Sequence, residues 1–144
     1  PLELDSPVCQ LVVHHLVHHH TTGEPYSDTQ VRRLARKLAP ATIDDLALVM
    51  TADSFGRPPL DSPQTLELIA ALRAKAHALE LERAAPRPLI QGRHLIALGH
   101  KPGPSFKPVL EAAFEAQLDG VFVDEAGGRE WLQSYLQRAP SGLT

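Results

Sequence analysis

Residues 27–38, SDTQVRRLARKL, have the pattern of a capped amphipathic helix. Ser27 followed by Gln30 three residues later is a capping-box signature, which satisfies backbone amides at the start of a helix. The apolar positions recur at helical spacing and form one stripe, made of Val31, Leu34, Ala35 and Leu38. We therefore predict a helix over this stretch that is buried along that stripe.

The same periodicity and similar caps predict helices along most of the chain. The expected ranges are 8–20, 27–38, 43–55, 62–83, 94–98, 104–118 and 130–138. Aromatic residues make up only 5% of the chain, which favours helices packed through aliphatic side chains over a β-sandwich. Residues 121–123 could form a strand but have no evident partner. We expect an all-α protein, with a helical bundle over 1–85 and a C-terminal module resembling a helix-hairpin-helix over 86–144.

The basic residues are concentrated in two stretches that contain no acid, although the net charge of the chain is −3. These stretches are residues 29–43 and 86–110, and each carries four Lys or Arg residues. Surface cations attract the phosphates of a nucleic acid whatever its base sequence. The candidate phosphate contacts are Arg32, Arg33, Arg36, Lys37, Arg93, Lys101 and Lys107.

The turn at residues 99–104, GHKPGP, resembles the turn of a helix-hairpin-helix. Gly99 and Gly103 can take a positive φ and let a phosphate approach the backbone. Pro104 at the first position of the next helix would leave nearby amides free to point at an anion. The alternative is that the turn is only a helix C-cap glycine followed by a helix that starts with proline.

A histidine cluster occupies the end of the first predicted helix, where His14 and His18 share one face. Residues four apart on a helix can chelate a metal, and His14, His15, His18 and Asp53 are the candidate ligands. The alternative is a solvated histidine face at a helix end. Because no convincing ligand set is visible, we expect neither a metal site nor a cofactor in this chain.

Nucleophilic catalysis has little support in the sequence. The single Cys9 lies in an apolar stripe, which predicts a buried and inert thiol. The chain contains no Gly-x-Ser-x-Gly elbow, Walker loop or dinucleotide fingerprint. We expect no catalytic residues in this chain.

Residues 89–106, together with Leu110 and residues 116–120, resemble the C-terminal signature of bacterial CCA-adding tRNA nucleotidyltransferases and their poly(A) polymerase relatives. The matching motifs are LIQGRHLIALG, then KPGPSF, then AQLDG. Upstream, residues 31–35 and 52–57 are similar to the helical body that follows the catalytic head in this family. The resemblance covers most of the chain.

The resemblance implies that the parent protein transfers nucleotides to the 3′ end of tRNA, either CCA or A alone. In the family, a separate head carries a Gly-Ser motif and an Asp pair that hold Mg²⁺ for phosphoryl transfer. This chain has no Gly-Ser followed by an Asp pair, and it begins at Pro1 rather than Met. We therefore expect a fragment whose N-terminal nucleotidyltransferase head lies outside it. The expected role of the fragment is to bind tRNA or another structured RNA by shape and backbone.

Two other functions remain open from the residues. Many family members contain an HD-type phosphohydrolase fold, in which His15 or His18 and Asp53 would be the trailing ligands, but this chain has no His-Asp doublet. A generic helix-hairpin-helix module that binds nucleic acid is the other alternative. The chain has no secretory signal and no long apolar run, so a cytoplasmic protein without membrane contact is expected.

Overall fold

The computed structural model describes Pro7, Leu11 and residues 26–56 and 63–138. Within these residues the regular structure is entirely α-helical, which confirms the predicted fold class. The helices are α2 (Asp28–Leu38), α3 (Ile43–Gly56), α4 (Pro63–Ala78), α5 (Gly92–Ala97), α6 (Phe106–Leu118) and α7 (Glu125–Arg138). The chain divides into two compact units, unit 1 (residues 1–86) and unit 2 (residues 87–144). Apart from Leu11, the helix predicted over 8–20 lies outside the described residues.

Two of the predicted caps of unit 1 are present. At the start of α2 the Gln30 amide donates to Ser27 Oγ (3.2 Å), and the Ser27 amide donates to Gln30 Oε1 (2.8 Å). At the start of α3 the Asp45 amide donates to Thr42 Oγ1 (3.1 Å), while Asp45 Oδ2 accepts from the Thr42 amide (2.9 Å). Each cap satisfies amides that have no partner within the helix, and it fixes where the helix begins.

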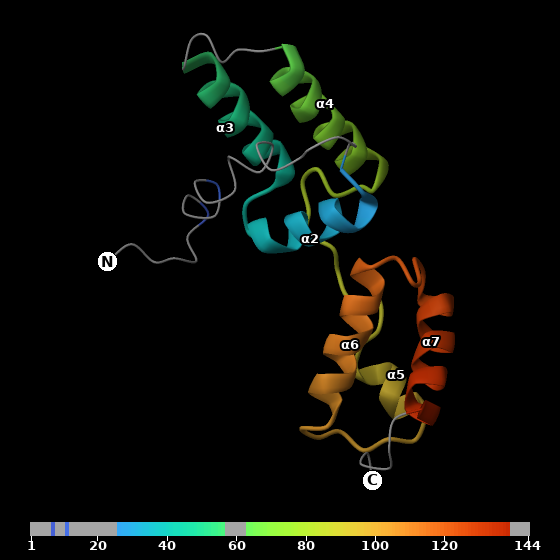
Figure 1. The fold of residues 1–144 in the computed structure, drawn as a ribbon. Coiled ribbons are helices and arrows are strands. Elements are labelled where there is room, and N and C mark those ends of the chain that lie inside the picture. The colour runs from blue at the N-terminus through green and yellow to red at the C-terminus, as the bar shows by residue number, and fades with distance from the viewer. Residues whose placement is uncertain (1–6, 8–10, 12–25, 57–62, 139–144) are drawn as a thin grey trace. The chain divides into compact units, whose positions relative to one another are not determined.

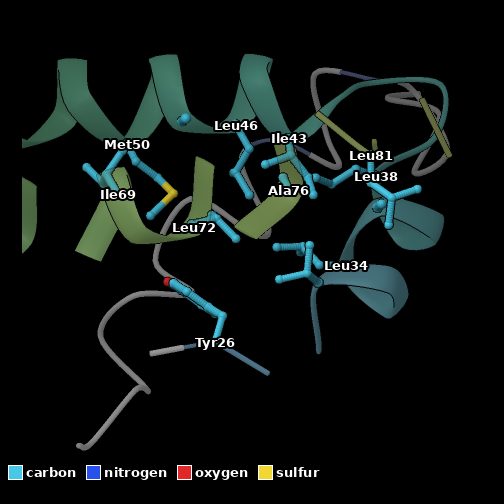
Figure 2. Packing of buried hydrophobic residues seen from close by; sticks show 13 residues of the cluster. Tyr26, Leu34, Leu38, Ile43, Leu46, Met50, Ile69, Leu72, Ala76 and Leu81 are labelled. Atoms are coloured by element: carbon cyan, nitrogen blue, oxygen red, sulfur yellow. The ribbon is translucent and has the colours of Figure 1, made fainter. Parts of the chain in front are cut away.

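The core of unit 1 lies between α3 and α4, which run side by side, and α2 packs against both (Figure 1). Figure 2 shows Met50 of α3 beside Ile69 of α4, with Leu72 and Ala76 further along α4. The predicted stripe of α2 is buried, as its spacing indicated. Aliphatic burial of this kind is the main term that stabilises the unit.

Helix α4 ends at Ala78, five residues before the predicted end at Arg83. Glu80 has a φ of 55°, and its amide donates to the His77 carbonyl (3.0 Å). The Leu81 amide donates to the Ala76 carbonyl (2.8 Å), and the Leu81 side chain is buried. This is a Schellman motif with a glutamate where glycine is usual. The prediction was wrong because no glycine or proline marks this stop.

In unit 2, α5 and α6 end in the same motif with glycine at the left-handed position. Gly99 has a φ of 88°, as predicted, and Gly120 has a φ of 77°. After α6 the Gly120 amide donates to the Gln117 carbonyl (3.0 Å). The predicted break at Asp119-Gly120 is therefore confirmed, and glycine takes this conformation without the steric cost that other residues meet.

Helix α7 begins at Glu125 rather than at the predicted Glu130. The Asp124 side chain accepts a hydrogen bond from the Gly127 amide (2.7 Å), and this bond caps the helix. A Cβ at Gly128 would lie 2.8 Å from Ile90 Cδ1, so glycine is the residue that fits there. Glycine is unfavourable in the interior of a helix, so Gly127 and Gly128 led the sequence analysis to place the start of this helix too late.

The stretch 121–123 forms no strand, contrary to one possibility raised from the sequence. Phe122 is buried in the core of unit 2, whereas Val121 and Val123 are exposed. The three residues connect α6 to α7 and place one aromatic ring in the core of unit 2. In that core the Phe122 ring lies 5.9 Å from the ring of Trp131.

Gln117 of α6 fastens the start of unit 2. Its Oε1 accepts from the Leu89 amide (2.9 Å), and its Nε2 donates to the Arg87 carbonyl (2.8 Å). These bonds satisfy backbone groups in a segment without regular structure, and they hold residues 87–89 against α6. Among the described residues no helix is both long and apolar enough to cross a bilayer.

Candidate nucleic-acid interface

The turn between α5 and α6 differs from the predicted phosphate cradle in its backbone. The amides of Gly99 and His100 donate to the carbonyls of Ile96 (2.9 Å) and Leu95 (3.1 Å). These two amides close the end of α5, so they do not point outward at an anion. The C-cap that was considered as the alternative accounts for Gly99.

Two further expectations about this turn are wrong. Gly103 does not have a positive φ, and a Cβ there would meet nothing within 4 Å. Pro104 does not start α6, because the first helical residue is Phe106 and its N-cap is Ser105. The Phe106 amide donates to the Gly103 carbonyl (3.1 Å), so a short turn precedes the helix. What remains of the predicted site here is the exposed cation Lys101.

Gly103 and Lys107 line a groove between α5 and α6 with a volume of about 560 Å³. Its walls are mostly apolar side chains, including Ile90, Phe106 and Leu110. Gly92 is also part of the wall, and a Cβ there would lie 3.6 Å from the Phe106 ring, an ordinary van der Waals contact. Lys107 is exposed at this groove.

Arg93 lies at a second groove, the α5–α7 groove, with a volume of about 330 Å³. Its lining residues are Arg93, His94, Ala97 and Leu98 from α5 and its C-cap, and Arg129, Leu132 and Gln133 from α7. Arg129 was not predicted from the sequence, because the helix was expected to begin at Glu130, the residue after Arg129. The signal that could have found it is the Glu125–Arg129 spacing of four residues, which is typical of a helical ion pair.

A buried histidine joins the two helices of the α5–α7 groove. The Gln91 amide donates to His94 Nδ1 (2.9 Å), so the neutral ring carries its hydrogen on Nε2. That nitrogen donates to Glu125 Oε1 (3.1 Å). His94 is only 5% exposed. Through its two hydrogen bonds it caps α5 and positions Glu125 of α7.

Glu125 is the centre of a cluster of donors. Arg93 Nη2 lies 3.4 Å from Glu125 Oε2, and Arg129 Nη2 contacts Oε1. Hydrogen bonds from His94, and then from Arg129, hold the pKa of the Glu125 carboxyl below its ordinary value of 4.5. The carboxylate is thus fixed in its charged form, with two guanidinium groups beside it.

The four cations of α2 are not equivalent. The Arg32 side chain is only 17% exposed and lies 4.0 Å from Asp28, which also pairs with Lys75 at 2.9 Å. Lys75, and then Arg32, hold the pKa of Asp28 below its ordinary value of 3.8. Arg33, Arg36 and Lys37 share the face opposite the buried stripe, at the helical spacings of three and four residues. Arg36 and Lys37 are exposed, whereas Arg33 is half-buried.

The candidate metal ligands divide between the described and undescribed residues. His14, His15 and His18 lie outside the described residues, as does Cys9. Asp53 lies in the last turns of α3. In the part of the chain that the structure describes, no group of three or more His, Cys, Asp or Glu residues is placed to hold a metal ion.

Comparison with known proteins finds similarity to a tRNA nucleotidyltransferase. The chain is 31% identical over 127 residues to the A-adding tRNA nucleotidyltransferase of Deinococcus radiodurans. The match covers 87% of this chain but only 29% of that enzyme, so the chain spans less than a third of the length of this relative. No family profile and no solved structure matches the chain. The similarity supports the resemblance to tRNA nucleotidyltransferases drawn from the sequence motifs.

Proposed function

We propose that this chain binds tRNA, or another structured RNA, as the body and tail portion of a tRNA nucleotidyltransferase. The observation that carries the proposal is the similarity over 127 residues to the A-adding enzyme of Deinococcus radiodurans. Nucleotidyl transfer to the RNA 3′ end, of CCA or of A alone, is the activity proposed for the parent protein. Its Mg²⁺-dependent chemistry would belong to a head outside this chain, and the present residues would hold the RNA.

Exposed cations in each unit support this role. In unit 1, Arg36 and Lys37 project from the face of α2 that lies opposite the core. In unit 2, Arg93, Lys101 and Lys107 are exposed around α5 and the start of α6. A structured RNA presents a regular array of phosphates, which such side chains bind with little regard to base sequence.

The test is a titration of the full chain with tRNA at several salt concentrations. We expect binding that weakens as salt rises, with a log–log slope of about one per phosphate contact. Lys37→Ala and Lys101→Ala should each reduce that slope by roughly one unit, because each removes one exposed cation. Glu111→Gln is a matched surface control that removes an acid instead. A chain that fails to bind tRNA at low salt, or binds with no salt dependence, would refute the proposal.

A second candidate function is general binding of double-stranded nucleic acid. It is favoured by the exposed cations Lys101 and Lys107 near the turn that joins α5 and α6, although the amides of that turn close the end of α5. Competition separates the two candidates. If duplex DNA displaces labelled tRNA as well as unlabelled tRNA does, the general function is preferred; if tRNA competes far better, it is rejected.

A further inference from the structure

The α5–α7 groove combines an unbalanced positive charge with an apolar floor. The side chains of Arg93 and Arg129 are 63% and 61% exposed, and both contact the single carboxylate of Glu125. Two guanidinium charges therefore face one carboxylate charge. Each guanidinium has five N–H donors, and the contact with Glu125 leaves most of them available.

Glu125 contacts both arginines, and its single charge offsets only one of their two positive charges. Holding a guanidinium in one geometry before a ligand arrives lowers the entropy cost of binding that ligand. Arginine is also the side chain whose planar donors match two phosphate oxygens at once. The rim of the groove is therefore suited to a phosphate group.

The remainder of the groove is suited to a flat, partly apolar group. Ala97 and Leu98 are exposed there, and Leu98 retains 41% of its surface in water. The exposed side-chain amide of Gln133 stands beside them and can donate and accept hydrogen bonds. A free phosphate bound at the arginines would leave this apolar surface exposed to water. The groove volume of about 330 Å³ is within the range of small-ligand sites.

We propose that the α5–α7 groove binds one unstacked nucleotide of an RNA, with its phosphate at Arg93 and Arg129 and its base over Ala97 and Leu98. This inference rests on the proposed RNA-binding function and specifies which part of the RNA unit 2 takes. An unpaired nucleotide exposes both its base face and its base edge, whereas a paired and stacked one hides them. Unit 2 would thus select loops, bulges or ends of a structured RNA.

The experiment is an NMR titration of the full ¹⁵N-labelled chain that follows the arginine Nε–H signals and the Gln133 side-chain amide. The probes are a short unpaired oligoribonucleotide, a blunt RNA duplex of the same length, free cytidine monophosphate and inorganic phosphate. The oligoribonucleotide should shift the signals of Arg93, Arg129 and Gln133 together. The duplex and inorganic phosphate should shift the two arginines weakly and leave Gln133 unmoved, and cytidine monophosphate should give the oligonucleotide pattern at higher concentration.

Substitutions separate the phosphate and base contacts. Arg129→Gln should weaken binding of the oligoribonucleotide about tenfold, the loss expected for one hydrogen bond to a charged group. Arg129→Lys should recover part of that loss because it keeps the charge without the planar donors. Leu98→Asn should weaken the oligoribonucleotide several-fold while leaving the response to inorganic phosphate unchanged. Arg138→Gln is the matched control, since it removes a cation about two and a half turns later, on the opposite face of α7.

Trp131 fluorescence verifies that each variant is folded, because Trp131 is the single tryptophan and lies in α7. Equal loss of affinity in Arg129→Gln and Arg138→Gln would overturn the proposal, since it would indicate only general attraction to charge. Shifts of the same size with inorganic phosphate and the oligoribonucleotide, or unchanged affinity in Leu98→Asn, would also overturn it. If tRNA still binds in those cases, the proposed function stands and only the nucleotide site is rejected. If tRNA does not bind at all, both fail.

Discussion

Unit 1 and unit 2 differ in how closely their binding surfaces are tied to their folding. In unit 1 the exposed cations Arg36 and Lys37 lie on the face of α2 opposite the buried stripe, so they take no part in the core. In unit 2 His94 caps α5, bonds to Glu125 of α7 and lines the α5–α7 groove. We therefore expect a change at Lys37, which is exposed on that face, to affect binding with little loss of stability, whereas changes in the unit 2 groove affect stability and binding together.

The largest expected effect on stability is in the unit 1 core. Leu72 of α4 is fully buried among side chains of α3 and α4 (Figure 2). Leu72→Ala should lower the free energy of unfolding of unit 1 by about 3 kcal/mol, through lost burial and a residual cavity. Urea unfolding followed by far-ultraviolet circular dichroism measures this loss. Trp131 fluorescence, which reports unit 2, should keep its wild-type midpoint; a matching shift there would mean that the two units unfold as one.

The corresponding change in unit 2 is Gly128→Val. The added side chain would start 2.8 Å from Ile90 Cδ1 and 3.0 Å from Phe122 Cε2, so α7 must move away from the segment that precedes α5. We expect a loss of about 2 kcal/mol, the usual cost of overpacking a closed site. The Trp131 fluorescence midpoint in urea should fall while the unit 1 transition is unchanged. Gly103→Ala is the control and should be nearly neutral, because its Cβ meets open space.

The two units also differ in how well the sequence predicted them. The start of α2 and its buried stripe were predicted in full because the capping box and the apolar spacing are local signals. The start of α7 was missed because Gly128 serves a contact with Ile90, far away in sequence, that no local pattern reveals. The early end of α4 was missed for a similar reason, since Glu80 adopts a left-handed φ while the neighbouring Leu81 is buried.

The predicted phosphate contacts remain a prediction, whereas the predicted geometry of the turn is wrong. Lys101 and Lys107 are exposed as expected of phosphate contacts. The amides of the predicted cradle, however, are bonded within the end of α5, which depends on backbone conformation rather than composition. The contacts of Arg93 and Arg129 with Glu125 could not be predicted from local sequence patterns, because they join α5 to α7.

Substitutions at the left-handed position of the Schellman motif should change stability by a smaller amount, with opposite sign in the two units. Glu80 holds a φ of 55° in unit 1, and Gly99 holds a φ of 88° in unit 2. Glu80→Gly should stabilise unit 1 by about 1 kcal/mol or slightly less, since glycine adopts this φ without steric cost. Gly99→Ala should destabilise unit 2 by about 1 kcal/mol for the converse reason. Circular dichroism and Trp131 fluorescence measure the two shifts, and two changes of the same sign would contradict the assigned backbone conformations.

The smallest expected effect is a dependence of unit 2 stability on pH through Glu125. Hydrogen bonds from His94, and then from Arg129, lower the pKa of Glu125 in the folded chain from its ordinary value of 4.5. A carboxyl whose pKa is lowered by folding stabilises the fold when the pH is above its ordinary pKa. That stabilisation is lost as the pH falls through the lower pKa of the folded state. Glu125→Gln keeps the oxygen that accepts from His94 but removes the charge.

We therefore expect the Trp131 thermal midpoint of Glu125→Gln to lie below the wild-type midpoint at neutral pH, and the difference to disappear in acid. Glu130→Gln is the matched control on the same helix, and it should show no such convergence, because Glu130 is exposed on α7 and is not part of the Glu125 cluster. A wild-type advantage over Glu125→Gln that persisted unchanged into acid would mean that the arginines and His94 do not favour the charged carboxylate. The two guanidinium groups would then not be positioned through Glu125, and the groove charges of unit 2 would be as separate from its fold as Lys37 is from the core of unit 1.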